Sequence, residues 1–208
     1  LYLREMAAFD QVYERCFNDD NCNPETLQAD NSGSREWQLD SIKLYQNIIK
    51  NYARYHRADQ AQFFLGSALQ DTGQIEEAAT AFKTLVKMYP QSNFRADAYV
   101  LIGEYYFDKN NAYGALKAFL KATAYKDSEK YPYALYKLGW CYYNVGDYAK
   151  AIDTMKMVVD ISQAQGDKAS AIQLQDEALK DLVRFFADAD AMNEAIEYFT
   201  KLGKQDLI

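Results

Sequence analysis

The sequence has few of the residues on which most catalytic and metal sites depend. Its 208 residues include a single histidine, His56, and three cysteines. A Ser/His/Asp or Cys/His arrangement would have to be built around that one imidazole, and the sequence contains no Gly-rich phosphate loop and no CxxC motif. We expect His56 to be an exposed residue at a helix junction, and we expect no enzyme activity, no cofactor and no metal site.

Long apolar runs and clusters of basic residues are also lacking. No run approaches the ~20 residues needed to span a bilayer, so we expect no membrane insertion by this chain. The 30 acidic residues outnumber the 23 basic ones, which gives a formal net charge of −7. Because nucleic acids and anionic membranes require a concentrated basic face, both are disfavoured as partners. The chain starts at Leu1 rather than Met and ends without a polar capping helix, so we expect it to be one part of a longer array.

Proline is rare as well, with three in the chain, and no strand-like alternation bounded by turn residues is present, which favours an all-helical protein. What the sequence does contain is one pattern repeated three times, at spacings of 37 and 36 residues. Each copy has an apolar residue before a glycine, an alanine further on, and a bulky residue four positions after the alanine. The three copies are Leu65-Gly66…Ala78…Phe82, Ile102-Gly103…Ala115…Phe119 and Leu138-Gly139…Ala151…Met155. A fixed period of this size indicates a helical hairpin stacked on copies of itself.

This pattern resembles that of the tetratricopeptide repeat (TPR) family, W-x2-L-G-x2-Y…A-x3-F…P. The resemblance implies an all-α, right-handed solenoid of antiparallel helix hairpins with about ten helices. The predicted units cover residues 59–95, 96–131, 132–167 and a degenerate copy at 168–208. Residues 1–58 are predicted to form an atypical repeat with a long polar loop at residues 18–34.

The resemblance also places a binding surface. In the family, the first helix of each unit lines a concave groove, and the matching residues here are Gln60, Phe63, Ser67, Gln70, Asp97, Val100, Glu104, Phe107, Tyr133, Tyr136, Trp140 and Tyr143. The last four lie on one face of a single helix, and we expect Trp140 to face solvent. An aromatic stripe beside acidic residues suits an apolar or basic peptide, or another protein's helix. Alternatively, another repeat, a second copy or the chain's own N-terminal segment covers the stripe.

The expected function is a non-catalytic scaffold that binds a partner peptide or helix in this groove. The alternative is a substrate-recruiting or regulatory TPR domain of a larger enzyme or regulator. Two stretches, YPQSNFRADAYVLIGEYYF and YPYALYKLGWCYYNVGDYAKAI, look like bacterial cell-envelope TPR proteins of the gliding-motility, Tol-Pal-associated and outer-membrane-assembly types. That resemblance implies a periplasmic or outer-membrane-associated location, with the cytoplasm as the alternative.

The cysteines bear on the compartment. Cys16 and Cys22 are candidates for a disulfide that would close a small ring at the start of the polar loop, which would indicate an oxidising compartment. The alternative is two free thiols in a cytoplasmic protein. Cys141 is expected to be a small buried hydrophobe. The acidic segment at residues 19–30 superficially copies a calcium loop, but Pro24 stands where such a loop needs glycine.

We predict that Cys16 and Cys22 are bonded in protein recovered from an oxidising compartment. Mass spectrometry after thiol alkylation, carried out before any reduction, distinguishes the two states. Recovery of both thiols in the alkylated form from periplasmically expressed protein would contradict the bond.

Overall fold

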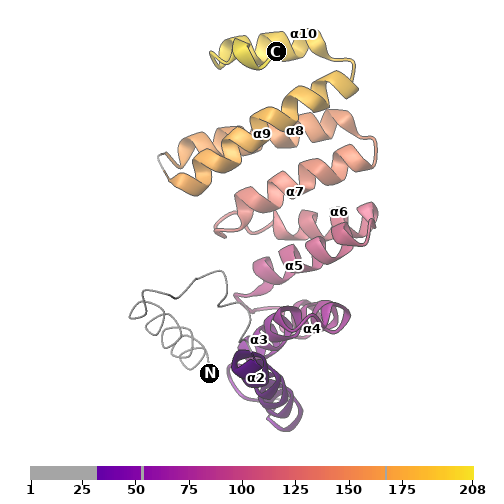
Figure 1. Cartoon of the computed structure of the whole chain (residues 1–208), viewed down its shortest axis with the longest axis vertical. Helices are drawn as coiled ribbons and strands as arrows, with labels where there is room; N and C mark the ends of the chain where they lie inside the picture. The colour runs from indigo at the N-terminus through magenta and orange to yellow at the C-terminus, as the bar shows by residue number, and fades with distance from the viewer. Residues whose placement is uncertain (1–31, 53, 167) are drawn as a thin grey trace, which may run out of the picture. The chain divides into compact units, whose positions relative to one another are not determined.

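The computed structural model describes residues 32–208 except residues 53 and 167. In this part of the chain the secondary structure consists of nine α-helices and one short 3-10 helix, without strands (Figure 1). The helices are α2 (Ser32–Asn51), α3 (Ala58–Asp71), α4 (Ile75–Met88), α5 (Arg95–Asp108), α6 (Ala112–Ala122), α7 (Tyr131–Asn144), α8 (Tyr148–Ala164), α9 (Ala169–Asp188), α10 (Met192–Lys201) and the 3-10 helix η2 (Gln205–Leu207). The all-α fold class predicted from the sequence is confirmed. The candidate disulfide Cys16–Cys22 and most of the predicted polar loop lie outside the described residues.

The chain divides into two compact units, with the boundary between Ser92 and Asn93. In the first unit, α3 and α4 form a hairpin, and α2 packs against α3. Ser41 in α2, which lies 37 residues before Ala78, is only 4% exposed. The helix α2 begins at Ser32, inside the segment predicted to be a polar loop.

The second unit contains three hairpins, α5–α6, α7–α8 and α9–α10. Its hydrophobic core runs from one hairpin to the next and includes the fully buried side chains of Phe119, Met155, Leu182 and Phe199. Contacts join α6 to α7 and α8 to α9, and the first helices also touch directly, α5 with α7 and α7 with α9. These three first helices therefore lie next to one another in the second unit.

Each hairpin turns at a residue with positive φ. Gly73 and Gly146 have φ values of 81° and 80°, and Asn110 and Asp190 have values of 56° and 54° at the matching places. This left-handed conformation ends the first helix of each pair. The carboxylate of Asp147 then accepts a hydrogen bond from the Lys150 amide at 3.3 Å, which caps the start of α8.

The glycines of the repeated motif lie where the two helices of a hairpin touch. A Cβ atom added to Gly66 would lie 2.5 Å from the Phe82 ring, and one added to Gly103 would lie 2.7 Å from the Phe119 ring. At Gly139 the nearest atom would be Cε of Met155, at 3.1 Å. The glycine at this position of the motif therefore faces a rigid ring in two hairpins and the flexible end of a methionine in the third.

We predict that Gly103→Ala destabilises the protein by about 1–3 kcal/mol, because the added methyl group would overlap a buried ring that cannot move freely. Gly139→Ala should be close to neutral. The Met155 side chain can shift, and alanine gains about 0.5–1 kcal/mol of helix propensity over glycine. Urea unfolding of both variants measures the difference, and equal losses of stability would contradict this account.

Candidate functional site

The first helices of the second unit share a surface rich in aromatic and acidic side chains, which we call the aromatic face. It is made up of Glu104 and Phe107 from α5, Tyr133, Tyr136, Lys137, Trp140 and Tyr143 from α7, and Asp181, Arg184 and Asp188 from α9. Most of these side chains are half-buried, and Arg184 and Asp188 are exposed. Because the three helices are adjacent, their side chains interact across the hairpin boundaries.

On the α5 side, the Tyr133 hydroxyl donates a hydrogen bond to Oε1 of Glu104 at 2.7 Å. The ammonium group of Lys137 lies 4.8 Å from the centre of the Phe107 ring and 5.7 Å from that of Tyr133. These distances are those of cation–π contacts. The start of α7 is thus held to α5 by one hydrogen bond and by a cation between two rings.

On the α9 side, a single carboxylate oxygen joins two aromatic side chains of α7. Oδ2 of Asp181 accepts hydrogen bonds from the Tyr136 hydroxyl at 2.8 Å and from Nε1 of Trp140 at 3.0 Å. One turn further along, the Tyr143 hydroxyl donates to Asp188 and accepts from Nε of Arg184 at 3.1 Å. The polar edges of the aromatic stripe are therefore bonded to α9.

Ring packing accompanies these hydrogen bonds. Tyr143 stacks on the buried Phe185 ring at a centroid distance of 4.5 Å, and Trp140 meets the same ring edge-on at 5.1 Å. The Arg184 guanidinium lies 5.7 Å from the Trp140 ring and 5.2 Å from the Tyr143 ring. Trp140 is consequently half-buried against α9, whereas the sequence led us to expect a solvent-facing ring. One side of the stripe is covered by the next repeat, which was one of the alternatives considered.

The environment raises the pKa values of the tyrosines on this face. Burial and then the hydrogen bond to Asp181 raise the pKa of Tyr136 to about 12. Burial, followed by the hydrogen bond to Glu104, raises the pKa of Tyr133, and the hydrogen bond to Asp188 is the main cause of the raised pKa of Tyr143. The hydroxyl groups therefore stay protonated at neutral pH and act as neutral donors to the carboxylates.

One residue of the predicted groove needs correction. Val100 is 4% exposed and belongs to the hydrophobic core of the second unit, so its side chain is not available to a partner. Asp97, Glu104 and Phe107, on the same helix, are half-buried. The resemblance placed Val100 in the groove, but its apolar side chain packs into the core instead.

The predicted groove residues of the first unit all lie on α3. Phe63 and Ser67 are half-buried on α3. The Phe63 ring packs against Phe82 at 5.7 Å, and the Ser67 hydroxyl donates to the Phe63 carbonyl at 3.4 Å. Gln60 is half-buried and Gln70 is exposed. Their role in binding stays a prediction.

Sequence reasoning missed the α9 contribution to the aromatic face. In the clear copies, the motif glycine lies twelve residues before the alanine, and Glu104 and Trp140 each follow that glycine. Val183 likewise lies twelve residues before Ala195, so Arg184 occupies the place of Glu104 and Trp140 in the fourth unit. Extending the pattern through the degenerate fourth copy would have found it. Asp181 and Asp188 stand outside the groove places, and no spacing in the sequence indicated them.

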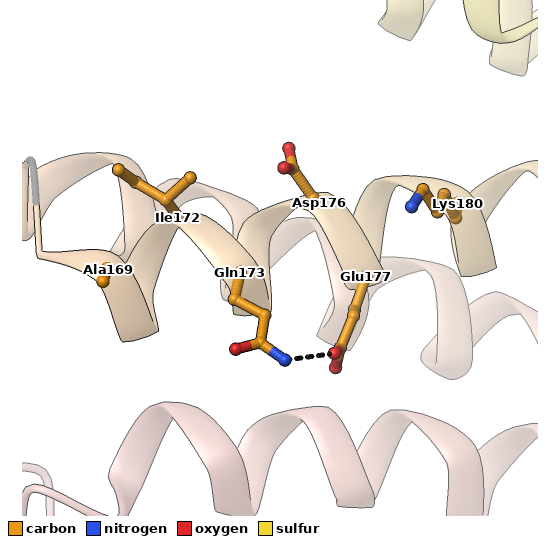
Figure 2. Close-up of a pocket in the computed structure, with 6 residues that line it drawn as sticks. All are labelled: Ala169, Ile172, Gln173, Asp176, Glu177 and Lys180. Atoms are coloured by element: carbon orange, nitrogen blue, oxygen red, sulfur yellow. Dashed lines mark hydrogen bonds between the residues drawn. The ribbon is translucent and has the colours of Figure 1, made fainter.

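Other surface features offer little chemistry. A shallow depression is lined by one helix only, through Ala169, Ile172, Gln173, Asp176, Glu177 and Lys180 of α9. In Figure 2, Gln173 and Glu177 point to one side of this helix, joined by a hydrogen bond of 3.1 Å, while Ile172 and Asp176 point to the other. Diverging side chains of this kind do not form the convergent polar groups of a small-molecule site.

Within residues 32–208, apart from residues 53 and 167, no group of three or more His, Cys, Asp or Glu side chains is arranged to hold a metal ion. None of the helices in that part is both long and apolar enough to cross a membrane. Cys141 is fully buried, and burial raises the pKa of its thiol to about 12, so it is protonated and unreactive at neutral pH.

Comparison with protein families gives matches to one type of repeat. A family model described as tetratricopeptide repeat matches residues 39–93 and 64–129, and a second model with the same description matches residues 133–162. Together they cover more than half of the chain. No curated protein matches the chain in sequence.

Several solved structures are similar in fold. The MamA protein aligns with a TM-score of 0.61 and 24% identity, over 87% of this chain and 91% of that one. MamA 41-end from Desulfovibrio magneticus RS-1 aligns with a TM-score of 0.53 and 22% identity, over 80% and 96% of the two chains. The TPR-like repeats of a kinesin light chain homologue from Podosopora anserina align with a TM-score of 0.57 and 16% identity, over 88% and 96%. At these identities the likeness concerns the fold alone.

We predict that Trp140→Ala costs about 1–3 kcal/mol of folding stability, because it removes a half-buried ring from Phe185 and leaves Asp181 with one donor fewer. Trp140→Phe should cost less, since the ring contact is kept. Tyr113→Ala is the matched control, because Tyr113 on α6 is 76% exposed and such changes usually stay within about 0.5 kcal/mol. Denaturant unfolding gives all three values, and a Trp140→Ala loss no larger than that of Tyr113→Ala would contradict the packing described here.

Proposed function

The chain belongs to the tetratricopeptide repeat family, and on that premise we propose that it is a non-catalytic scaffold whose aromatic face binds a peptide or helix of a partner protein. The observation that carries the proposal is the set of aromatic rings that α5 and α7 present beside the charged side chains of α9. Phe107, Tyr133, Tyr136, Trp140 and Tyr143 are half-buried, so each keeps part of its ring available for contact.

The orientation of these rings supports a binding role. Hydrogen bonds to Glu104, Asp181 and Asp188 hold the polar edges of the α7 aromatics in place. A side chain already held in one orientation loses little conformational entropy when a partner binds. Aromatic side chains are also the commonest energetic anchors of protein interfaces. The face therefore has the composition and the rigidity that a protein-binding surface requires.

We also propose a cellular location for the protein. It would belong to a complex of the bacterial envelope, in the periplasm or at the outer membrane, such as a motility complex. This location is supported by the residue pattern of segments 89–107 and 131–152, which looks like that of envelope TPR proteins. Fractionation of the native cells with an antibody against this chain tests it. Recovery in the envelope fractions would support the location, and recovery in the cytoplasm alone would overturn it.

We predict that peptides selected on this chain from an unbiased library bind the aromatic face. Phe107→Ala and Tyr143→Ala should each weaken such peptides more than tenfold, as expected for aromatic anchors. Tyr113→Ala, which removes an exposed ring from α6, should leave affinity unchanged. Fluorescence anisotropy of labelled peptides measures the dissociation constants, and circular dichroism verifies that each variant is folded. Peptides that bind all three variants equally well would show that the face is not the binding site.

A further inference from the structure

The aromatic face carries an excess of carboxylates. We propose that its ligand is a basic segment, a peptide or helix whose Lys or Arg side chains reach Glu104, Asp181 and Asp188. This inference rests on the proposed function, because it names the chemistry of the partner for that same face.

The charges on the first helices of the second unit are unequal. Together α5, α7 and α9 carry seven acidic residues and four basic ones. The acidic residues are Asp97, Glu104, Asp108, Asp176, Glu177, Asp181 and Asp188, and the basic ones are Arg95, Lys137, Lys180 and Arg184. The charges of Asp108 and Glu177 contribute to the raised pKa values of Tyr133 and Tyr136, respectively, so both add to the negative potential at these hydroxyls. The whole chain has a net charge of −7, so long-range attraction also favours a basic partner.

Two of these carboxylates, Glu104 and Asp181, are oriented without being neutralised. Glu104 accepts from the Tyr133 hydroxyl, and Asp181 accepts from Tyr136 and Trp140. Among the residues that the structure describes, neither carboxylate forms an ion pair within 4.0 Å. The bonds to Asp181 use a single oxygen, Oδ2, so Oδ1 is left to accept from a ligand. A fixed and uncompensated carboxylate is a preorganised acceptor for an ammonium or guanidinium group.

The two cations of the face are directed at rings. Lys137 lies over Phe107 and Tyr133, and Arg184 lies over Trp140 and Tyr143. The Arg184 Nε atom is also 3.7 Å from Asp188. An acidic ligand would have to draw these cations away from the rings. Its negative charges would also lie close to the carboxylates of the face, and this like-charge repulsion disfavours binding. A basic ligand meets the carboxylates directly and can lay its aliphatic stems along the rings.

Three synthetic peptide pools test the inference. They share one length and one set of apolar residues, and their variable positions are Lys/Arg, Asp/Glu or Ser/Gln. Peptides retained by the immobilised chain are identified by mass spectrometry, and the best are measured by fluorescence anisotropy. We expect retention from the Lys/Arg pool, with affinity that falls as salt is added.

Isosteric variants locate the contacts. Glu104→Gln and Asp181→Asn should each weaken a retained basic peptide by about two- to fivefold, the range of a partly exposed ion pair. Asp153→Asn is the matched control, because Asp153 is an exposed carboxylate on α8, a helix that contributes no residue to the face. Basic peptides that bind the Asp181→Asn and Asp153→Asn variants equally tightly are held by non-specific charge and would overturn the inference.

The same measurements separate the two proposals. Retention of acidic or neutral peptides, with binding lost in Phe107→Ala, would overturn the basic ligand and leave the aromatic face as a binding site. If no retained peptide from any pool depends on Phe107 or Tyr143, the face itself is not a binding site, and both proposals fall.

Discussion

The contact on which the rest of the structure depends is the close approach of two helices at a glycine. In α3, α5 and α7 this glycine faces a bulky side chain from the second helix of its own hairpin, Phe82, Phe119 or Met155. These three side chains are buried completely or almost completely. A Cβ atom would overlap the rings of Phe82 and Phe119 and would press on the flexible end of Met155, so the backbone of the first helix comes this close because no side chain intervenes. The hairpin geometry follows from that approach.

Stacking the hairpins of the second unit then brings their first helices together. The contacts of α7 with α5 and α9 set tyrosine and tryptophan donors opposite carboxylates from both neighbours. Each bond joins two successive hairpins, so the row of donors and acceptors holds the hairpins to one another while it shapes the surface. The same residues thus contribute to the stability of the stack and to its chemistry.

This double role explains why the aromatic face is half-buried. A ring that lay fully in solvent would be free to rotate, and a ring fully in the core would be closed to a partner. Trp140 and Tyr143 lie between these extremes, with one side against Phe185 and Arg184 of α9. The Arg184 guanidinium lies over part of each ring and adds a cation–π contact to the packing.

The sequence by itself determined the fold class, the hairpin repeat and the helices that carry the aromatic stripe. It could do so because Gly66, Gly103 and Gly139 recur with their bulky partners at a fixed spacing, and packing of this kind depends on local periodicity. The position of Tyr136, Trp140 and Tyr143 on one face of α7 followed from helical geometry alone.

Only the tertiary structure decided what those rings contact. Asp181 and Asp188 lie 41 and 45 residues from Trp140 and Tyr143, in a degenerate repeat whose register is hard to assign from sequence. The burial of Val100 likewise depends on the side chains that surround it in the core of the second unit. Spacing specifies which way a side chain leaves its own helix, but its neighbours come from other helices, and their positions are set by how the hairpins pack.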